Sequence, residues 1–263
     1  MIILFSASLV LGAVAGLFAG LFGIGGGLIM VPVLAMLFAA QGFAAETVMI
    51  MAVATSLATI ILTSIASVIA HHRLGAVLWD KVFRLTPGII AGSVLGAVIA
   101  DLISGEVLRF IFIIYLLYAA IELALQRKPN AGQKPSSRFL DYFAGLVIGS
   151  LSALIGIGGG TLTVPYLVYF QAPIRNAVAV SSACGLPIAV AGTVSYVLLG
   201  WGAPLLPEWS LGYIYLPSFI GIVMTSVITA PIGAKLASVI PAQKLKRYFA
   251  LLLLAVAAKM IWF

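Results

Sequence analysis

Gly23-Ile24-Gly25-Gly26-Gly27 lies inside the first apolar stretch of the chain, and the same five residues return as Gly156-Ile157-Gly158-Gly159-Gly160 in a later one. A Val-Pro pair follows each string at the same distance, as Val31-Pro32 and Val164-Pro165. Each glycine costs a helix about 1 kcal/mol relative to alanine. Three neighbouring glycines also do not follow the every-fourth-residue spacing of a helix-packing face. The strings therefore predict two breaks in apolar helices that serve a purpose other than packing.

The composition is that of an integral membrane protein. Hydrophobic residues make up 63% of the chain and charged residues only 8%, whereas about a quarter of a soluble domain is charged. The apolar stretches are long and show no period-two alternation, which indicates helices and not barrel strands. The formal net charge is +7, but the basic residues flank apolar stretches. We therefore expect a lipid bilayer, and no nucleic acid, as partner. No basic residue precedes the first stretch, so we expect it to remain in the mature chain.

Eight helical stretches are predicted from the apolar pattern. The parts that follow the glycine strings, 28–40 and 161–170, are shorter than the roughly 20 residues that a full crossing needs. We expect re-entrant hairpins or broken helices at these two places. The stretches are 2–40, 47–70, 85–103, 107–126, 139–170, 176–199, 211–238 and 246–262.

A polar, proline-punctuated segment at 127–138 divides the chain into halves that match each other. With the glycine strings aligned, Gly12 and Gly16 match Gly145 and Gly149. We therefore predict an all-α integral membrane protein with two repeats, residues 1–126 and 139–263, joined by a linker. Each repeat is expected to contain one broken hairpin and three transmembrane helices.

The basic residues predict how the halves are oriented. If the spans alternate as drawn, every Lys and Arg except Arg109 and Lys259 falls on one side of the membrane, and the positive-inside rule makes that side cytoplasmic. The linker is then cytoplasmic and both termini are periplasmic. The first stretch begins and ends outside while the fifth begins and ends inside. The two repeats are therefore expected to have inverted topologies.

Inverted repeats with discontinuous helices are typical of secondary transporters, which bind substrate near the midplane at the repeat interface. The glycine strings would meet there from opposite faces. Proline is best tolerated in the first turn of a helix, so Pro32 and Pro165 predict helices that restart only shortly before them. The first N–H groups of such helices have no helical acceptor and, with the helix dipole, attract anions.

Helix packing is the alternative use of glycine, and we expect it for two other sets. These are Gly12, Gly16 and Gly20, and Gly88, Gly92 and Gly96, which all recur at every fourth position. Such small-residue faces would also allow a homodimer.

The doubled Gly-Ile-Gly-Gly-Gly with its trailing Val-Pro resembles the sulfite exporter TauE/SafE family. So do Ala54-Thr55-Ser56-Leu57 and Ser181-Ser182-Ala183-Cys184-Gly185-Leu186-Pro187, and together these motifs cover nearly the whole chain. The resemblance implies a permease of the bacterial inner membrane that moves sulfur-containing anions such as sulfite or organosulfonates.

The predicted substrate-binding residues are the glycines of both strings and two pairs of hydroxyls in equivalent spans, which could donate to sulfonate oxygens. For the hydroxyls, bonding to their own helix carbonyls is an open alternative. No metal or cofactor is expected. The residues are Gly23, Gly25, Gly26, Gly27, Thr55, Ser56, Gly156, Gly158, Gly159, Gly160, Ser181 and Ser182.

We therefore predict a secondary transporter, with export as its direction, for small sulfur-containing anions. An anion channel and a non-transporting membrane assembly subunit remain alternatives. An enzyme is not expected, because HExxH, GxSxG and paired buried carboxylates are absent from the sequence. Asp101, Glu122 and Asp141 all fall near the ends of predicted spans, so proton coupling through a mid-span carboxylate is not expected either.

Overall fold

The computed structural model describes residues 2–22, 26–125, 136–237 and 242–262, and within these it contains ten helices. The chain is an all-α integral membrane protein, as predicted, and the one sheet that the described residues form is a two-stranded hairpin. The eight apolar stretches give ten helices because each stretch that carries a glycine string contains two. The elements are α1 Ile2–Phe22, α2 Gly27–Ala40, α3 Ala45–Arg73, α4 Trp79–Leu102, α5 Gly105–Leu125, α6 Arg138–Ile155, α7 Gly160–Tyr169, α8 Ile174–Leu199, β1 Ser210–Leu211, β2 Ile214–Tyr215, α9 Leu216–Ala237 and α10 Ala242–Ile261.

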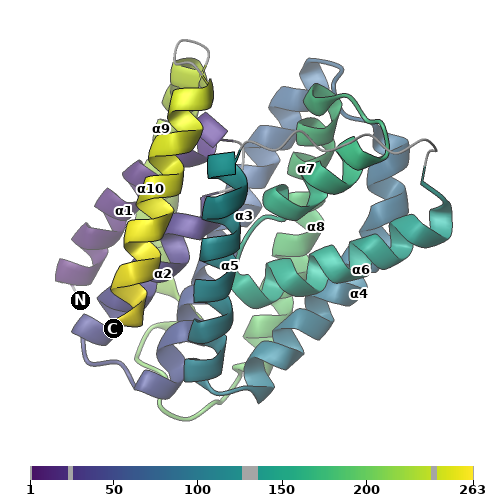
Figure 1. The fold of residues 1–263 in the computed structure, drawn as a ribbon. Helices are drawn as coiled ribbons and strands as arrows, with labels where there is room; N and C mark the ends of the chain where they lie inside the picture. Colours follow the sequence, from purple (N-terminus) through teal and green to yellow (C-terminus); the bar gives the residue numbers. More distant parts are fainter. Residues whose placement is uncertain (1, 23–25, 126–135, 238–241, 263) are drawn as a thin grey trace.

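The two expected return arms are separate short helices. With 14 residues in α2 and 10 in α7, they reach about 21 and 15 Å at 1.5 Å per residue, well short of a bilayer core of about 30 Å. Figure 1 shows that α1 begins, and α2 ends, at the end of the molecule where both termini lie. By contrast, α6 enters and α7 returns at the opposite end, where α3 and α9 also end.

Five helices of the described chain are long and apolar enough to cross a membrane: α3, α4, α5, α6 and α8. Of these, α6 belongs to a stretch that the sequence predicts to be a broken hairpin, and at 18 residues it is long enough to cross by itself. The described apolar part of α9 is Leu216–Ala230. Full crossings by α9 and α10 stay predictions.

Helices α3 and α8 form the centre of the molecule and pack against each other. The most apolar window is 78% buried in α3 and 61% buried in α8. Around them, α1 packs along α9, α4 along α6, and α5 along α10. The first helix of each half therefore packs on the fourth helix of the other half, and the halves interlock.

Glycine allows the close approach of α4 to α6 and of α1 to α9. A Cβ on Gly88, Gly92 or Gly96 of α4 would collide with backbone carbonyls of α6, and one on Gly12 would collide with the backbone of α9. The packing role predicted for these glycines is confirmed. Because α6 and α9 of the same chain cover them, these faces are not free to pair with a second copy.

Candidate functional site

Gly26 and Gly159 begin the return helices in the same unusual way. Each is the N-cap residue of its helix and has φ of 74°. Residues with a Cβ rarely adopt this left-handed conformation, because Cβ comes too close to the following carbonyl oxygen. Gly23, Ile24 and Gly25 of the first string lie outside the described residues, so its described part is Gly26-Gly27.

Both helix starts carry backbone donors without helical acceptors. The Gly26 carbonyl accepts the N–H groups of Ile29 and Met30, each at 3.1 Å, and the Gly159 carbonyl accepts those of Leu162 and Thr163 at 3.1 and 2.8 Å. The N–H groups ahead of these have no carbonyl one turn back in the helix. No side chain caps either N-terminus in the described part of the chain. The partial positive charge of each helix start is thus not neutralised by a side chain.

The prolines lie one turn deeper than the sequence suggested. Pro32 and Pro165 are each the sixth residue of their helix. Each return helix therefore begins directly after its left-handed glycine cap, more than one turn before the proline. A proline at this depth has no N–H for the carbonyl four residues earlier. It therefore leaves the carbonyls of Leu28 and Thr161 without their usual helical donor, close to the tips.

The tips of the two hairpins touch. A Cβ on Gly27 would collide with the Gly156 carbonyl oxygen and lie 3.0 Å from the Cα of Ile157. The Ser56 hydroxyl, fully buried on α3, donates to that same carbonyl at 2.8 Å. The contact places the start of α2 against the connection between α6 and α7, with α3 alongside this junction.

On the other side of the second string lies α8. A Cβ on Gly185 would be 3.1 Å from the Gly158 carbonyl oxygen and 3.0 Å from the Ser64 hydroxyl of α3. The start of α7 is also tied to α5, because the hydroxyls of Thr161 and Tyr115 hydrogen-bond each other. Of the predicted glycines, Gly26, Gly27, Gly156, Gly158, Gly159 and Gly160 all lie at or beside the junction and are buried.

Three of the four predicted hydroxyls are already engaged. The Thr55 oxygen accepts the N–H of Tyr215 at 3.1 Å and so holds β2 against α3. Ser56 holds Gly156, and Ser182 donates to the carbonyl of Val178 in its own helix at 3.0 Å. Of the four, Ser181 alone has a buried hydroxyl without a hydrogen-bond partner among the described residues.

Two hydroxyls outside the predicted set border the second tip. A Cβ on Gly159 would lie 3.3 Å from the Ser152 oxygen of α6 and 3.4 Å from the Thr163 oxygen of α7. Both residues are fully buried, and neither hydroxyl has a hydrogen-bond partner in the described part of the chain. A buried hydroxyl without a partner costs about 1–3 kcal/mol, so the pair is suited to a polar ligand. Both residues lie within one helical turn of the glycine string, and this position in the sequence could have marked them as candidate site residues.

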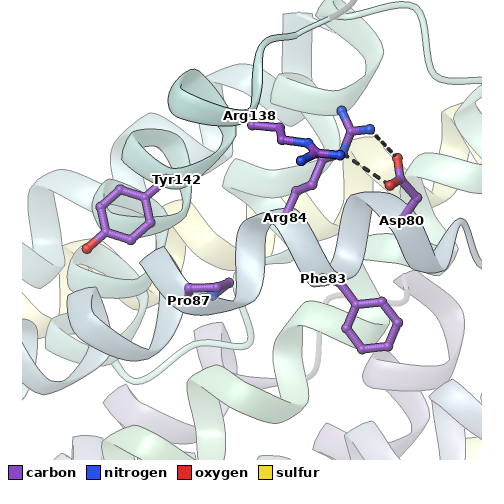
Figure 2. A pocket seen from close by; sticks show the side chains of 6 residues that line it. All are labelled: Asp80, Phe83, Arg84, Pro87, Arg138 and Tyr142. Carbon is purple, nitrogen blue, oxygen red and sulfur yellow. Dashed lines mark hydrogen bonds and ion pairs between the residues drawn. The ribbon is translucent and has the colours of Figure 1, made fainter.

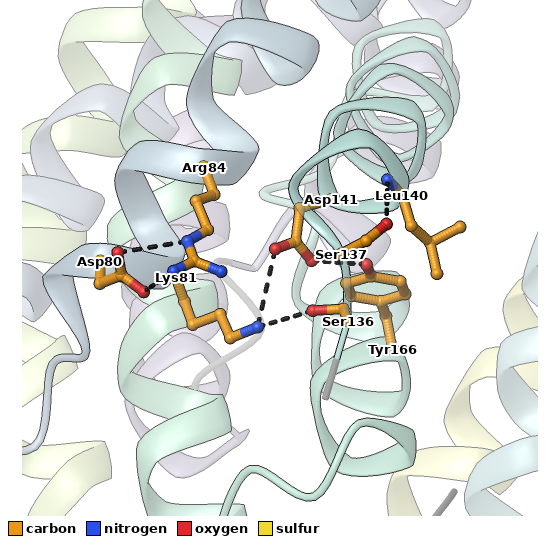
Figure 3. Close-up of polar contacts among 8 residues, drawn as sticks. All are labelled: Asp80, Lys81, Arg84, Ser136, Ser137, Leu140, Asp141 and Tyr166. Carbon is orange, nitrogen blue, oxygen red and sulfur yellow. Dashed lines mark hydrogen bonds and ion pairs between the residues drawn. The ribbon is translucent and has the colours of Figure 1, made fainter. Parts of the chain in front are cut away.

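A polar cluster anchors the second hairpin where it enters the molecule (Figure 3). Asp141, in the first turn of α6, is fully buried. The Tyr166 hydroxyl of α7 donates to its Oδ1 at 2.7 Å, and Lys81 Nζ of α4 lies 3.6 Å from its Oδ2. Lys81 also donates to the Ser136 hydroxyl at 2.6 Å. The cluster links both arms of the hairpin to α4.

The architecture and the site define a class. The chain is a multi-pass membrane protein with two glycine-capped broken hairpins whose tips meet in its interior. Its family follows from comparison with known proteins: the chain belongs to the sulfite exporter TauE/SafE family, whose model matches residues 8–260. The resemblance seen in the sequence is confirmed.

Curated relatives support the same class. A "Probable membrane transporter protein" of Haemophilus influenzae is 38% identical over 253 residues, which cover 96% of each chain. One of Methanocaldococcus jannaschii is 26% identical over 232 residues, covering 87% of this chain and 84% of the relative. YunE of Bacillus subtilis, with the same description, is 29% identical over 211 residues, covering 73% and 77%. The chain is a membrane transporter.

Proposed function

We propose that the chain is a secondary carrier that exports small sulfur-containing oxyanions, such as sulfite or a short organosulfonate. The observation that carries the proposal is the contact of Gly27 with Gly156 and Ile157, which sets the uncapped start of α2 against the short connection that leads to the uncapped start of α7. Backbone N–H groups and helix dipoles that converge in this way bind anions without a charged side chain. The family description, sulfite exporter, supports the sulfur oxyanion as substrate class.

The hydroxyls give the proposed site a polar wall. Ser152 and Thr163 beside Gly159 are buried and unpartnered among the described residues, and each can donate to an oxyanion. The substrate would then lie against the second tip, with N–H groups of both helix starts and these two hydroxyls as donors. Because the tips are in contact, they must part for the substrate to enter and leave, as alternating access requires.

We place the carrier in a bacterial inner membrane with two inverted repeats, residues 1–126 and 139–263. The basic residues at the end of α3 and the start of α4, in the linker 127–138, at the start of α8 and around the start of α10 would face the cytoplasm. Both termini would be periplasmic. The arrangement in Figure 1 supports this proposal, since α3, α9 and the hairpin of α6 and α7 reach one end and both termini the other.

A reconstituted system tests the proposal. Proteoliposomes that contain the purified protein should take up radiolabelled sulfite, and unlabelled sulfite trapped inside should accelerate uptake, as exchange through a carrier does. A conductance without such counterflow would indicate the channel alternative. Absence of flux together with absence of ligand-induced thermal stabilisation would refute both.

A ligand screen tests the substrate class separately. Sulfite, sulfate, taurine and sulfoacetate should raise the thermal midpoint of the detergent-solubilised protein more than acetate or malonate. Equal stabilisation by carboxylates would remove the sulfur oxyanion while leaving an anion carrier in place.

A further inference from the structure

The start of α4 and the start of α6 enclose a pocket on the outside of the helix bundle. Its volume is about 390 Å³, and its lining combines charged and apolar side chains. Figure 2 shows Arg84 and Arg138 extending toward the Asp80 end, with Phe83 and Tyr142 at the sides. The lining residues are Asp80, Phe83, Arg84, Pro87, Arg138 and Tyr142.

The pocket carries one positive charge that the protein does not neutralise. Arg84 forms a bidentate pair with Asp80, at 2.9 and 3.2 Å. Arg138 makes neither a hydrogen bond nor an ion pair with any residue that the structure describes. Two guanidinium groups against one carboxylate leave a net charge of one, and the planar guanidinium fork matches a phosphate group.

The pocket lies where the charged ends of two helices give way to apolar faces. In α4 no charged residue follows Arg84 until Asp101, and in α6 none follows Asp141. Phe83 is 69% exposed, and Tyr142 and Trp79 are also exposed, a pattern typical of aromatic residues at the level of lipid headgroups. Below the pocket, exposed side chains continue along both helices, with Ile90 and Val94 on α4 and Val147 and Leu151 on α6.

We propose that this pocket binds the headgroup of an anionic phospholipid, with the phosphate on Arg138 and Arg84 and an acyl chain along the apolar face below Pro87. Basic pockets between transmembrane helices are suited to such headgroups. A zwitterionic lipid adds a cation beside two arginines and fits less well. The bound lipid would bridge α4 and α6 at the end where Lys81 and Asp141 also join them, so it would stabilise the entry of the second hairpin.

Native mass spectrometry of the detergent-solubilised protein tests the proposal. The wild-type chain should retain phosphatidylglycerol in preference to phosphatidylcholine. Because each arginine near anionic lipid contributes roughly 1 kcal/mol, Arg138→Gln and Arg84→Gln should each weaken phosphatidylglycerol binding about fivefold. Arg138→Lys, which keeps the charge but lacks the fork, should weaken binding less than Arg138→Gln does. The matched control is Arg109→Gln at the start of α5, at the other end of the molecule (Figure 1), and it should leave binding unchanged.

Three results would overturn the proposal. One is equal retention of the two lipids, and another is equal loss of binding in Arg138→Gln and Arg109→Gln. The third is displacement of phosphatidylglycerol by an equimolar amount of inorganic phosphate, which would make the pocket a site for free anions. Since the measurement involves no sulfur oxyanion and no flux, its outcome is independent of the proposed transport function.

Discussion

The two hairpins share a backbone design but differ in their side chains. Each begins its return helix at a left-handed glycine, Gly26 or Gly159, with φ of 74°. At the first tip, a Cβ on this glycine would be 3.1 Å from the Met30 methyl group and 3.5 Å from the Ala19 methyl group. At the second tip, the residues in the same places relative to the string are Thr163 and Ser152. The first tip is thus apolar and the second hydroxylated.

The side chains at the start of each hairpin differ in the same way: those of the second hairpin are more polar. At the second hairpin, Asp141 of α6 pairs with Lys81 of α4. At the first, Ser8 lies as far before its string as Asp141 does, and its hydroxyl donates to Ser218 of α9 at 2.9 Å. Lys81 and Ser218 are each the third residue of their helix. An ion pair with a buried carboxylate thus anchors one hairpin, and a neutral hydroxyl pair anchors the other.

Removing the lysine should have the largest effect on stability. Lys81→Met leaves Asp141 buried without its cation and should cost about 3–5 kcal/mol, whereas Ser218→Ala should cost only about 1 kcal/mol. Denaturant unfolding of both variants in detergent measures the difference. Adding Asp141→Leu to Lys81→Met should restore most of the loss, because the uncompensated charge is then gone. Equal losses in the two single variants would show that the anchors do not differ in strength.

Substitution of the cap glycines should have the next largest effect. Gly26→Ala and Gly159→Ala should each cost about 1–2 kcal/mol for the left-handed conformation. Gly159→Ala should cost more, since its Cβ would be 2.6 Å from the Ile188 Cδ1 atom. Gly42→Ala is the matched control: its φ is 78° and no atom lies within 4 Å of the added Cβ. Thermal midpoints should fall in all three, while sulfite flux should be lost only at the tips; loss of flux in Gly42→Ala would contradict a role for the tips.

The hydroxyls of the second tip should affect binding more than folding. Ser152→Ala and Thr163→Val should each weaken sulfite affinity about five- to tenfold. Stability should stay the same or rise, because a buried hydroxyl without a partner is removed. Isothermal titration with sulfite measures the affinity. Ser93→Ala should not change the affinity; it removes a hydroxyl on α4 that is equally buried and has no partner in the described part of the chain. Unchanged affinity in both tip variants would place the substrate elsewhere.

The smallest effect is expected from Ser182→Ala. Its hydroxyl donates to Val178 in the same helix, so we expect a change of stability below about 0.5 kcal/mol and no measurable change in sulfite affinity. The same titration tests this. A loss as large as that of Ser152→Ala would mean that Ser182 leaves its carbonyl and donates to the bound substrate.

The sequence predicted local features well, because these depend on nearby residues. Glycine strings that interrupt apolar stretches predicted the breaks before α2 and α7, and the every-fourth-residue spacing predicted the packing role of Gly88, Gly92 and Gly96. The depth of Pro32 in its helix was predicted wrongly, because proline marks a helix start only when no stronger signal precedes it. Here the left-handed Gly26 was that signal.

Features that depend on distant segments were beyond the sequence. The sequence places Asp141 near the end of a predicted span. No neighbouring residue in the sequence indicates that Lys81 and Tyr166 contact it. The engagement of Thr55 by Tyr215, 160 positions away, could not be foreseen either. Ser152 and Thr163 could be predicted from the sequence, because the residues that flank the two strings differ. Hydroxyl side chains flank the second string, and apolar side chains flank the first.

The interlocked halves have a consequence for biogenesis. Helix α1 leaves the ribosome well before its partner α9, which is made some 200 residues later: Thr225 donates to the Leu9 carbonyl across 216 positions. Until α9 arrives, the Gly12 and Gly16 face of α1 must rest against lipid or against the insertion machinery. Assembly must therefore finish after translation of α9, and contacts this distant in sequence favour slow folding. The two halves expressed as separate polypeptides should accumulate only when they are produced together.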